Sequence, residues 1–134
     1  MTDNPVLSVI IPLYQEGNHL AVSMRTIISH LEALGDSYEL LLVDDGSNDN
    51  TWQIITELSS IFPEVTGIRF SRNFGKEAAI SAGIEYSRGR GIVIMDGDLQ
   101  HPPSLIAQMV QSWKGGHDIV DAIKVERGTE SVIY

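Results

Sequence analysis

Two kinds of hydrophobic pattern alternate along the chain. The first is a short, nearly continuous apolar run rich in β-branched residues, which is typical of a strand buried on both faces. Such runs predict strands at 7–14, 38–47, 65–70, 91–95 and 117–123. The second is a longer segment of helical character, either apolar at every third or fourth position or rich in alanine. Such segments predict helices at about 18–34, 50–62, 76–86 and 102–113.

Glycine, proline and capping residues mark where the helices begin and end. Gly35 stops the first helix, and any of residues 48–50 can cap the second. Pro102 opens the last helix, which Gly115 and Gly116 end. The alternation of strands and helices predicts a single α/β domain over residues 1–134, a mostly parallel sheet with helices on both faces. No closing element is predicted after residue 123, so we expect a truncated part of a longer protein.

Charge and residue usage narrow the classes of function. The 134 residues include 18 acidic and nine basic side chains, a net charge of −9, which disfavours unaided binding of nucleic acid. An anionic substrate would need a bound metal or clustered basic residues. No cysteine is present, which excludes disulfides and thiolate-bound zinc. The start MTDNP is unlike a signal peptide, and the longest apolar run, 6–14, is too short for a membrane span. We therefore expect a soluble chain, with membrane association only through segments that it lacks.

Polar residues follow the carboxyl ends of four consecutive predicted strands. In open parallel sheets these ends share one edge, and ligands bind there near the point where the strand order reverses. A single acid at a strand end is usually a turn former or helix cap, but four strand ends that agree indicate a site. The residues are Pro12, Tyr14, Gln15 and Glu16, then Asp44 and Asp45, then Arg72 and Asn73, then Asp96 and Asp98.

The stretch IVIMDGDLQHPP, residues 92–103, carries the clearest chemical signal. Side chains two apart on an extended segment point the same way, so Asp96 and Asp98 would hold two carboxylates close together. Such a pair is unfavourable unless a cation joins it. All-oxygen ligands, with Gln100 able to add a carbonyl, suit Mg²⁺ or Mn²⁺ rather than a softer metal. Because bound Mg²⁺ usually also contacts substrate phosphates, this Asp-x-Asp motif suits a diphosphate leaving group.

Other nucleotide and phosphate sites fit the sequence less well. A dinucleotide-binding Rossmann domain has an acid after its second strand, which Asp44 or Asp45 supplies, but it needs a GxGxxG turn after the first, and none is present. No GxxxxGK[ST] loop is present either. A phospho-acceptor receiver domain would have its acidic pair after the first strand, whereas here the pair follows the second. By elimination, the edge is predicted to bind a nucleotide diphosphate through acids.

Four blocks in order, VIIPLYQE, LLVDDGSNDNT, FSRNFGKEAAISAG and IMDGDLQHPP, together resemble glycosyltransferase family 2. More narrowly, they are similar to the polyprenyl-phosphate sugar transferases of the dolichyl-phosphate mannosyltransferase and undecaprenyl-phosphate glucosyltransferase type. The resemblance runs from about residue 7 to the end. It implies a GT-A fold, a UDP- or GDP-hexose donor, Mg²⁺ or Mn²⁺, inversion at the anomeric carbon and a polyprenyl phosphate acceptor.

The resemblance also implies roles for individual residues. The nucleotide-binding set is Pro12, Tyr14, Glu16, Asp44, Asp45, Arg72, Lys76 and Asp96. Asp96 and Asp98 are the expected catalytic residues. The expected metal site consists of Asp98 and Gln100 together with Asp96, which also lines the nucleotide pocket. A basic pair, Lys124 and Arg127, faces the diphosphate or the acceptor phosphate.

Three positions depart from the residues that are usual in the family. Gln15 stands where Asn is common, and Gly97 stands where Ala is common. Lys124 stands where Arg is usual, which loses a bidentate contact with phosphate. None of the three is an expected metal ligand.

Three hypotheses remain for the chain. In the first, it is the donor-binding part of an inverting glycosyltransferase, whose ionised lipid-phosphate acceptor needs no general base. In the second, it is a nucleotide-binding module or inactive remnant without transfer activity. In the third, it is a receiver-like signalling domain that is phosphorylated on an Asp. A full-length transferase would work at the cytoplasmic face of the membrane, where nucleotide sugars are available, and exposed apolar surface would favour homo-oligomers.

Overall fold

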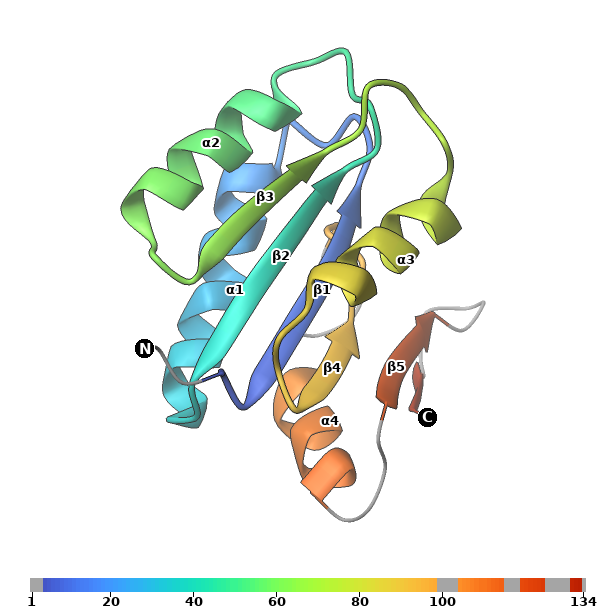
Figure 1. Ribbon diagram of the computed structural model, residues 1–134. Helices are drawn as coiled ribbons and strands as arrows, with labels where there is room; N and C mark the ends of the chain where they lie inside the picture. The colour runs from blue at the N-terminus through green and yellow to red at the C-terminus, as the bar shows by residue number, and fades with distance from the viewer. Residues whose placement is uncertain (1–3, 99–103, 115–118, 125–130, 134) are drawn as a thin grey trace.

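The computed structural model of the protein describes residues 4–98, 104–114, 119–124 and 131–133. Within these residues the chain forms a six-stranded sheet, in which β1 to β5 run parallel and β6 runs antiparallel to β5 (Figure 1). The strands are β1 (Leu7–Leu13), β2 (Tyr38–Asp44), β3 (Val65–Arg69), β4 (Gly91–Ile94), β5 (Ile119–Lys124) and β6 (Ser131–Ile133).

The order of the strands, β3-β2-β1-β4-β5-β6, shows how the chain winds outward from β1. β2 and β3 are added on one side of β1, and the chain then returns to place β4 and β5 on the other side. The winding therefore reverses between β1 and β4. Open α/β sheets bind ligands at such a reversal, outside the carboxyl ends of the strands.

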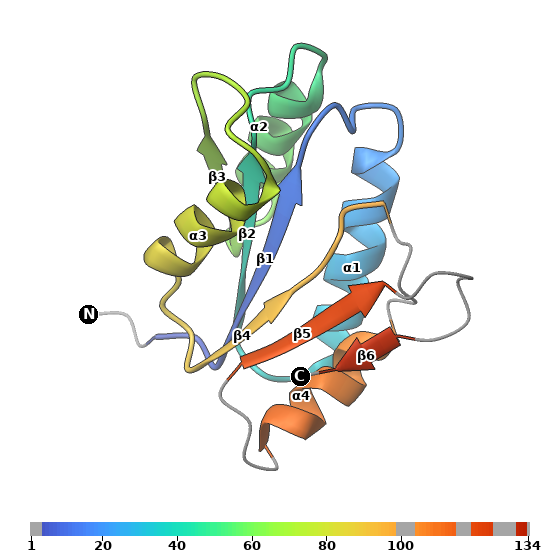
Figure 2. The ribbon, with the colours of Figure 1, turned by 90° about the vertical axis from the view of Figure 1, so that its right-hand side faces the viewer.

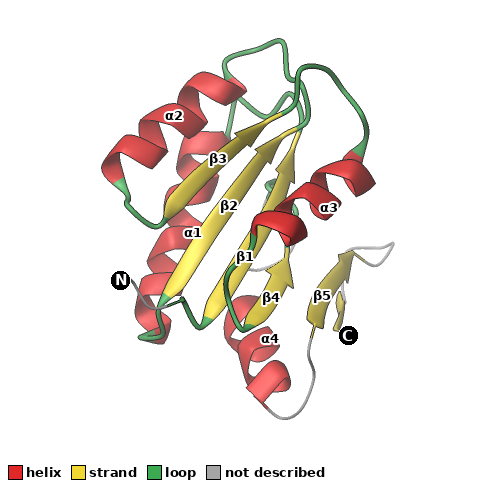
Figure 3. Ribbon diagram, in the orientation of Figure 1, coloured by secondary structure: helices red, strands yellow, loops and turns green. Residues whose placement is uncertain are grey.

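Helices cover both faces of the sheet. Figure 2 looks along the sheet, with α3 on one side and α1 and α4 on the other, and Figure 3 shows the same layers by secondary structure. α2 lies on the same face as α1 and packs over β3 and β2. The helices are α1 (Leu20–Leu34), α2 (Thr51–Ile61), α3 (Lys76–Tyr86) and α4 (Leu105–Lys114).

The side chains of each strand alternate between two apolar layers. Val9 and Ile11 of β1 belong to the larger cluster, together with buried residues of α1, α2 and α4. Ile10, between them, belongs to a smaller cluster with Leu41 and Ile94, against which Ile80 of α3 packs. Both faces are covered, so β1 is apolar nearly throughout instead of alternating apolar and polar residues.

The predicted fold class, a mostly parallel α/β sheet with helices on both faces, is confirmed. The second strand ends at Asp44 rather than at 47, because Gly46 adopts a φ of 76° and turns the chain. No strand was predicted after residue 123, whereas β6 pairs antiparallel with β5. Three residues at a sheet edge are too few to give a periodic pattern. None of the described helices is long and apolar enough to cross a membrane.

Candidate functional site

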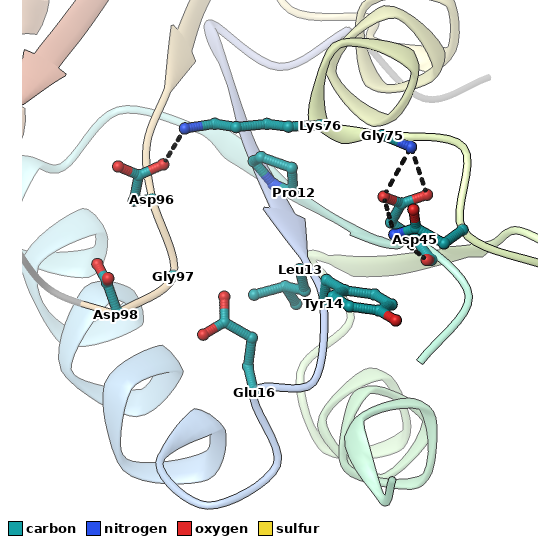
Figure 4. A pocket seen from close by; sticks show the side chains of 11 residues that line it. Pro12, Leu13, Tyr14, Glu16, Asp45, Gly75, Lys76, Asp96, Gly97 and Asp98 are labelled. Carbon is teal, nitrogen blue, oxygen red and sulfur yellow. Dashed lines mark hydrogen bonds and ion pairs between the residues drawn. The ribbon is translucent and has the colours of Figure 1, made fainter. Parts of the chain in front are cut away.

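A cavity of about 500 Å³ opens at the carboxyl ends of the strands, beside the reversal between β1 and β4 (Figure 4). Three of its residues follow members of the smaller apolar cluster by an even number of positions: Pro12 follows Ile10 by two, Asp45 follows Leu41 by four, and Asp96 follows Ile94 by two. The alternation of a strand therefore brings their side chains out on the α3 face of the sheet. The full lining is Pro12, Leu13, Tyr14, Glu16, Asp45, Asn73, Gly75, Lys76, Asp96, Gly97 and Asp98.

The segment after β1 is held against the segment after β2. Gln15 has a φ of 55°, and its N–H donates to Ser47 Oγ at 2.8 Å. Its side-chain Oε1 accepts from the N–H of Asn48 at 2.7 Å. Asn, which is common at position 15 in the family, adopts positive φ more readily than Gln does. Its side chain is one methylene shorter, so it would not reach as far toward the N–H of Asn48. The turn at Gln15 leaves Tyr14 and Glu16, on either side of it, in the cavity wall.

Asp45 uses its carboxylate to hold the loop between β3 and α3. The residue is 4% exposed. Its Oδ1 accepts from the N–H groups of Phe74 at 2.7 Å and Gly75 at 3.2 Å. Its Oδ2 accepts from Asn73 Nδ2 at 2.9 Å and from Gly75 N–H at 3.0 Å. Both oxygens are therefore engaged, and they fix the backbone immediately before Lys76.

Gly46 allows the same loop to lie directly on the segment after β2. A Cβ at this position would stand 2.2 Å from the carbonyl carbon of Arg72 and 2.5 Å from the backbone nitrogen of Asn73. Both of those atoms belong to the backbone, so no side-chain rotation could relieve the overlap. The absence of a side chain at Gly46 is thus a condition for the loop that carries Lys76 to sit where it does.

Asp96 and Asp98 form the wall of the cavity opposite Asp45 (Figure 4). Asp96 Oδ1 lies 2.6 Å from Lys76 Nζ, and Asp98 is exposed at the edge. Within the described residues, no group of three or more His, Cys, Asp or Glu side chains could hold a metal. Two carboxylates fit Mg²⁺ or Mn²⁺ nonetheless, because such ions commonly take their remaining ligands from phosphate and water.

Glu16 faces this pair of acids across the cavity (Figure 4). Its Oε1 lies 3.0 Å from His19 Nε2, and His19 Nδ1 lies 3.2 Å from Ser23 Oγ. Burial raises the pKa of Glu16 from its ordinary value of 4.5; His19 opposes that rise, and the charges of Asp98 and Asp96 add to it. A cation bound between the acids would favour the ionised form of Glu16.

Two residues of the predicted nucleotide-binding set lie outside the cavity lining. Asp44 is fully buried and, by alternation, on the opposite face of the sheet from Asp45. Its Oδ1 accepts from Ser47 N–H at 3.0 Å, and its Oδ2 has no hydrogen-bond partner among the described residues. Arg72 stacks its guanidinium on the Phe74 ring, 4.4 Å from the ring centre.

The other six members of that set line the cavity, as does Asp98. Gln100 and Arg127 lie outside the described residues. Lys124 ends β5, and its side chain is likewise outside what the structure describes.

His19 and Gly75 belong to the site but were not among the predicted site residues. His19 stands three residues after Glu16, a spacing that brings side chains together on a helical turn, and that spacing was the available signal. Gly75 has no such signal, because its role rests on the hydrogen bonds of its N–H to Asp45, which lies 30 residues earlier.

A family model described as glycosyl transferase family 2 matches residues 8–134. The uncharacterized glycosyltransferase YkcC of Bacillus subtilis (strain 168) is 40% identical over 124 residues, which cover 92% of this chain and 38% of the relative. The undecaprenyl-phosphate 4-deoxy-4-formamido-L-arabinose transferase of Aeromonas hydrophila is 33% identical over 127 residues, which cover 94% of this chain and 39% of the relative. The chain thus spans about two fifths of the length of these relatives.

Solved structures share the fold. A mannosyltransferase from Pyrobaculum calidifontis, in complex with GDP-Man and Mn²⁺, matches with a TM-score of 0.60 and 23% identity over 72% of this chain and 28% of its own. S. aureus TarS 1–349, in complex with UDP, matches with a TM-score of 0.58 and 21% identity over 69% of this chain and 27% of its own. The GT-A fold that the family resemblance implies is confirmed.

Proposed function

Because the chain belongs to glycosyl transferase family 2, we propose that its cavity binds a nucleotide-diphosphate sugar together with Mg²⁺ or Mn²⁺. We propose further that the whole protein transfers a hexose from this donor to a polyprenyl phosphate, with inversion at the anomeric carbon. One observation carries the proposal: Asp96 and Asp98 present two carboxylates to a cavity at the reversal of the sheet, with Lys76 beside them.

The relatives support the choice of substrates. A relative that matches nearly the whole of this chain is named an undecaprenyl-phosphate sugar transferase, which favours a polyprenyl phosphate as acceptor. The structure from Pyrobaculum calidifontis holds GDP-Man and Mn²⁺, and that of TarS holds UDP, which favours a nucleotide-sugar donor. Such an acceptor is a membrane lipid, and nucleotide sugars are available in the cytoplasm, so we propose that the reaction takes place at the cytoplasmic face of the membrane.

Each wall of the cavity has a part in binding the donor. Tyr14, 45% exposed at the cavity wall, offers an aromatic face for the nucleobase. Asp45 holds the loop that forms the neighbouring wall. Asp96 and Asp98 would hold the metal, with Gln100 as the further predicted ligand. When bound, the metal neutralises the negative charge that develops on the diphosphate.

The transfer itself needs no general base. An oxygen of the acceptor phosphate, ionised at neutral pH, attacks the anomeric carbon as the bond from that carbon to the nucleotide diphosphate breaks. The nucleoside diphosphate leaves from the opposite face, which inverts the anomeric centre. The protein then contributes mainly orientation and electrostatic stabilisation. Lys124 and Arg127 are the predicted contacts for the diphosphate or acceptor phosphate.

Calorimetric titration with UDP and with GDP, each with and without Mn²⁺, tests the donor site. We expect one of the two nucleotides to bind more tightly than the other and to require the metal. We expect its binding to be lost in Asp98→Ala. Asp36→Ala is the matched control, because Asp36 is a surface acid paired with Lys114 at 2.9 Å, outside the cavity lining. This variant should bind the nucleotide as the wild type does.

Three outcomes would count against the proposal. Failure of both nucleotides to bind to a folded chain would exclude a competent donor site. Binding that is indifferent to Mn²⁺ would exclude the metal. If the donor site is confirmed but the complete protein moves no sugar, the chain would be a nucleotide-binding module without transfer activity.

A further inference from the structure

The side chain of Lys76 spans the cavity from one wall to the other. It starts at the first residue of α3 and ends with Nζ 2.6 Å from Oδ1 of Asp96, which follows β4 (Figure 4). Lys76 is an exposed residue, and its side chain remains 61% exposed in this contact, whereas that of Asp96 is 26% exposed. The Lys76 ammonium is thus paired with the Asp96 carboxylate, which would lie beside a bound metal.

The charge balance of the cavity explains why an ammonium lies there. Its described lining contains four acids, Glu16, Asp45, Asp96 and Asp98, and one cationic side chain, Lys76. With every acid ionised the formal charge is four negative and one positive, a net −3. A nucleotide diphosphate is itself an anion, so the cavity repels it until cations are bound. Metal and ammonium then compete for Asp96, because the two positive charges repel each other at one carboxylate.

We propose that Lys76 is a mobile counter-ion of this site: it pairs with Asp96 before the metal and donor bind, and it moves to the donor's diphosphate when the metal takes its place. This inference rests on the proposed function. The same lysine then opposes the binding of metal alone and favours the binding of nucleotide with metal. It couples the binding of metal to the binding of nucleotide, because the diphosphate offers the displaced ammonium a new anionic partner.

The structure allows the side chain to move without the loop. Asp45 accepts from the N–H of Gly75 at 3.0 Å and from that of Phe74 at 2.7 Å, so the backbone before Lys76 is fixed. The Lys76 side chain is 61% exposed, so an ammonium on its four methylenes can reorient at little cost.

The test is a pair of affinity measurements on Lys76→Met. The proposal predicts that the affinity for metal alone and the affinity for nucleotide with metal change in opposite directions. The affinity for Mn²⁺ without nucleotide is read from the spin-resonance signal of the free ion. We expect it to rise about two- to fivefold, as for the loss of an exposed ion pair. The affinity for UDP or GDP at saturating Mn²⁺ is read by calorimetry. We expect it to fall about tenfold or more, as for the loss of a charged hydrogen bond to phosphate.

Lys114→Met is the matched control, because Lys114 is an exposed lysine paired with Asp36 at 2.9 Å outside the cavity lining. It should change neither affinity. If the wild type binds nucleotide with metal but Lys76→Met leaves the Mn²⁺ affinity unchanged, or shifts both affinities in the same direction, the inference is overturned and the proposed function stands. If the folded wild type binds neither Mn²⁺ nor a nucleotide, both are overturned.

Discussion

Replacing Asp45 by Asn should loosen the loop between β3 and α3 and lower the stability of the protein. Both carboxylate oxygens accept hydrogen bonds from this loop, at 2.7 to 3.2 Å. In Asn one oxygen becomes an amino group. If that group takes the place of Oδ2, it opposes Gly75 N–H and Asn73 Nδ2. If it takes the place of Oδ1, it opposes the N–H of Phe74. Either orientation leaves a backbone donor facing another donor.

The magnitude follows from the number and kind of hydrogen bonds lost. A hydrogen bond to a charged group contributes about 1.5–3 kcal/mol, and Asp→Asn removes at least one such bond and weakens the others by removing the charge. Asn73 is exposed and can turn its amide to offer an oxygen, which offsets part of this loss. We therefore expect a loss of about 2 kcal/mol, near the lower end of that range.

Urea unfolding monitored by circular dichroism measures this loss, and hydrogen exchange at the amides of Phe74 and Gly75 locates it. Exchange at these two amides should accelerate in Asp45→Asn while the amides of β1 keep their protection. Asp36→Asn, which changes a surface acid with one ion pair, should stay within about 0.5 kcal/mol of the wild type. If Asp45→Asn also stays within about 0.5 kcal/mol, the carboxylate does not hold the loop and the reasoning fails.

Two further predictions concern Gly46 and Glu16. Gly46→Ala should cost about 3 kcal/mol or more in urea unfolding, because its Cβ would overlap the backbone of Arg72 at 2.2 Å. Gly35→Ala, at a similar φ of 79° but with nothing within 4 Å of the Cβ, should cost only about 1 kcal/mol, and equal costs would refute the overlap. Burial raises the pKa of Glu16 from 4.5, and His19 opposes this rise. The folded state therefore favours the protonated form of Glu16. The wild type loses stability as the pH rises through the raised pKa. Glu16→Gln should therefore match the wild type at about pH 4 and exceed it in free energy of unfolding at about pH 7, and a difference that is independent of pH would contradict this.

The local pattern of the sequence was enough to predict the layers of the fold. Continuous apolar runs such as 7–14 imply strands covered on both faces, and helical segments between them imply parallel strands joined by crossovers. β6 escaped prediction because pairing at a sheet edge depends on the neighbouring strand rather than on its own three residues. The end of β2 was placed three residues late, because the apolar pattern does not register the turn at Gly46.

The candidate site was predicted in outline and not in its contacts. Strand ends and acids singled out Pro12, Asp45 and Asp96, which do line one cavity. The sequence grouped Asp44 with Asp45, because neighbours on a chain look alike in a motif. Side chains one apart on a strand nevertheless point to opposite faces, and only Asp45 reaches the cavity.

The sequence by itself determined what depends on neighbours along the chain: the order of strands and helices, the acids after each strand, and the family to which the four motifs belong. The contacts that depend on which face of the sheet each helix covers could be known only from the tertiary structure. Because α3 packs on the face that Ile10 and Ile94 share, Lys76 at its start meets Asp96, 20 residues later, and Asp45 meets Gly75. These contacts depend on how segments that are far apart in the sequence are aligned in the sheet. The packing of the whole sheet determines that alignment, and no local sequence pattern encodes it.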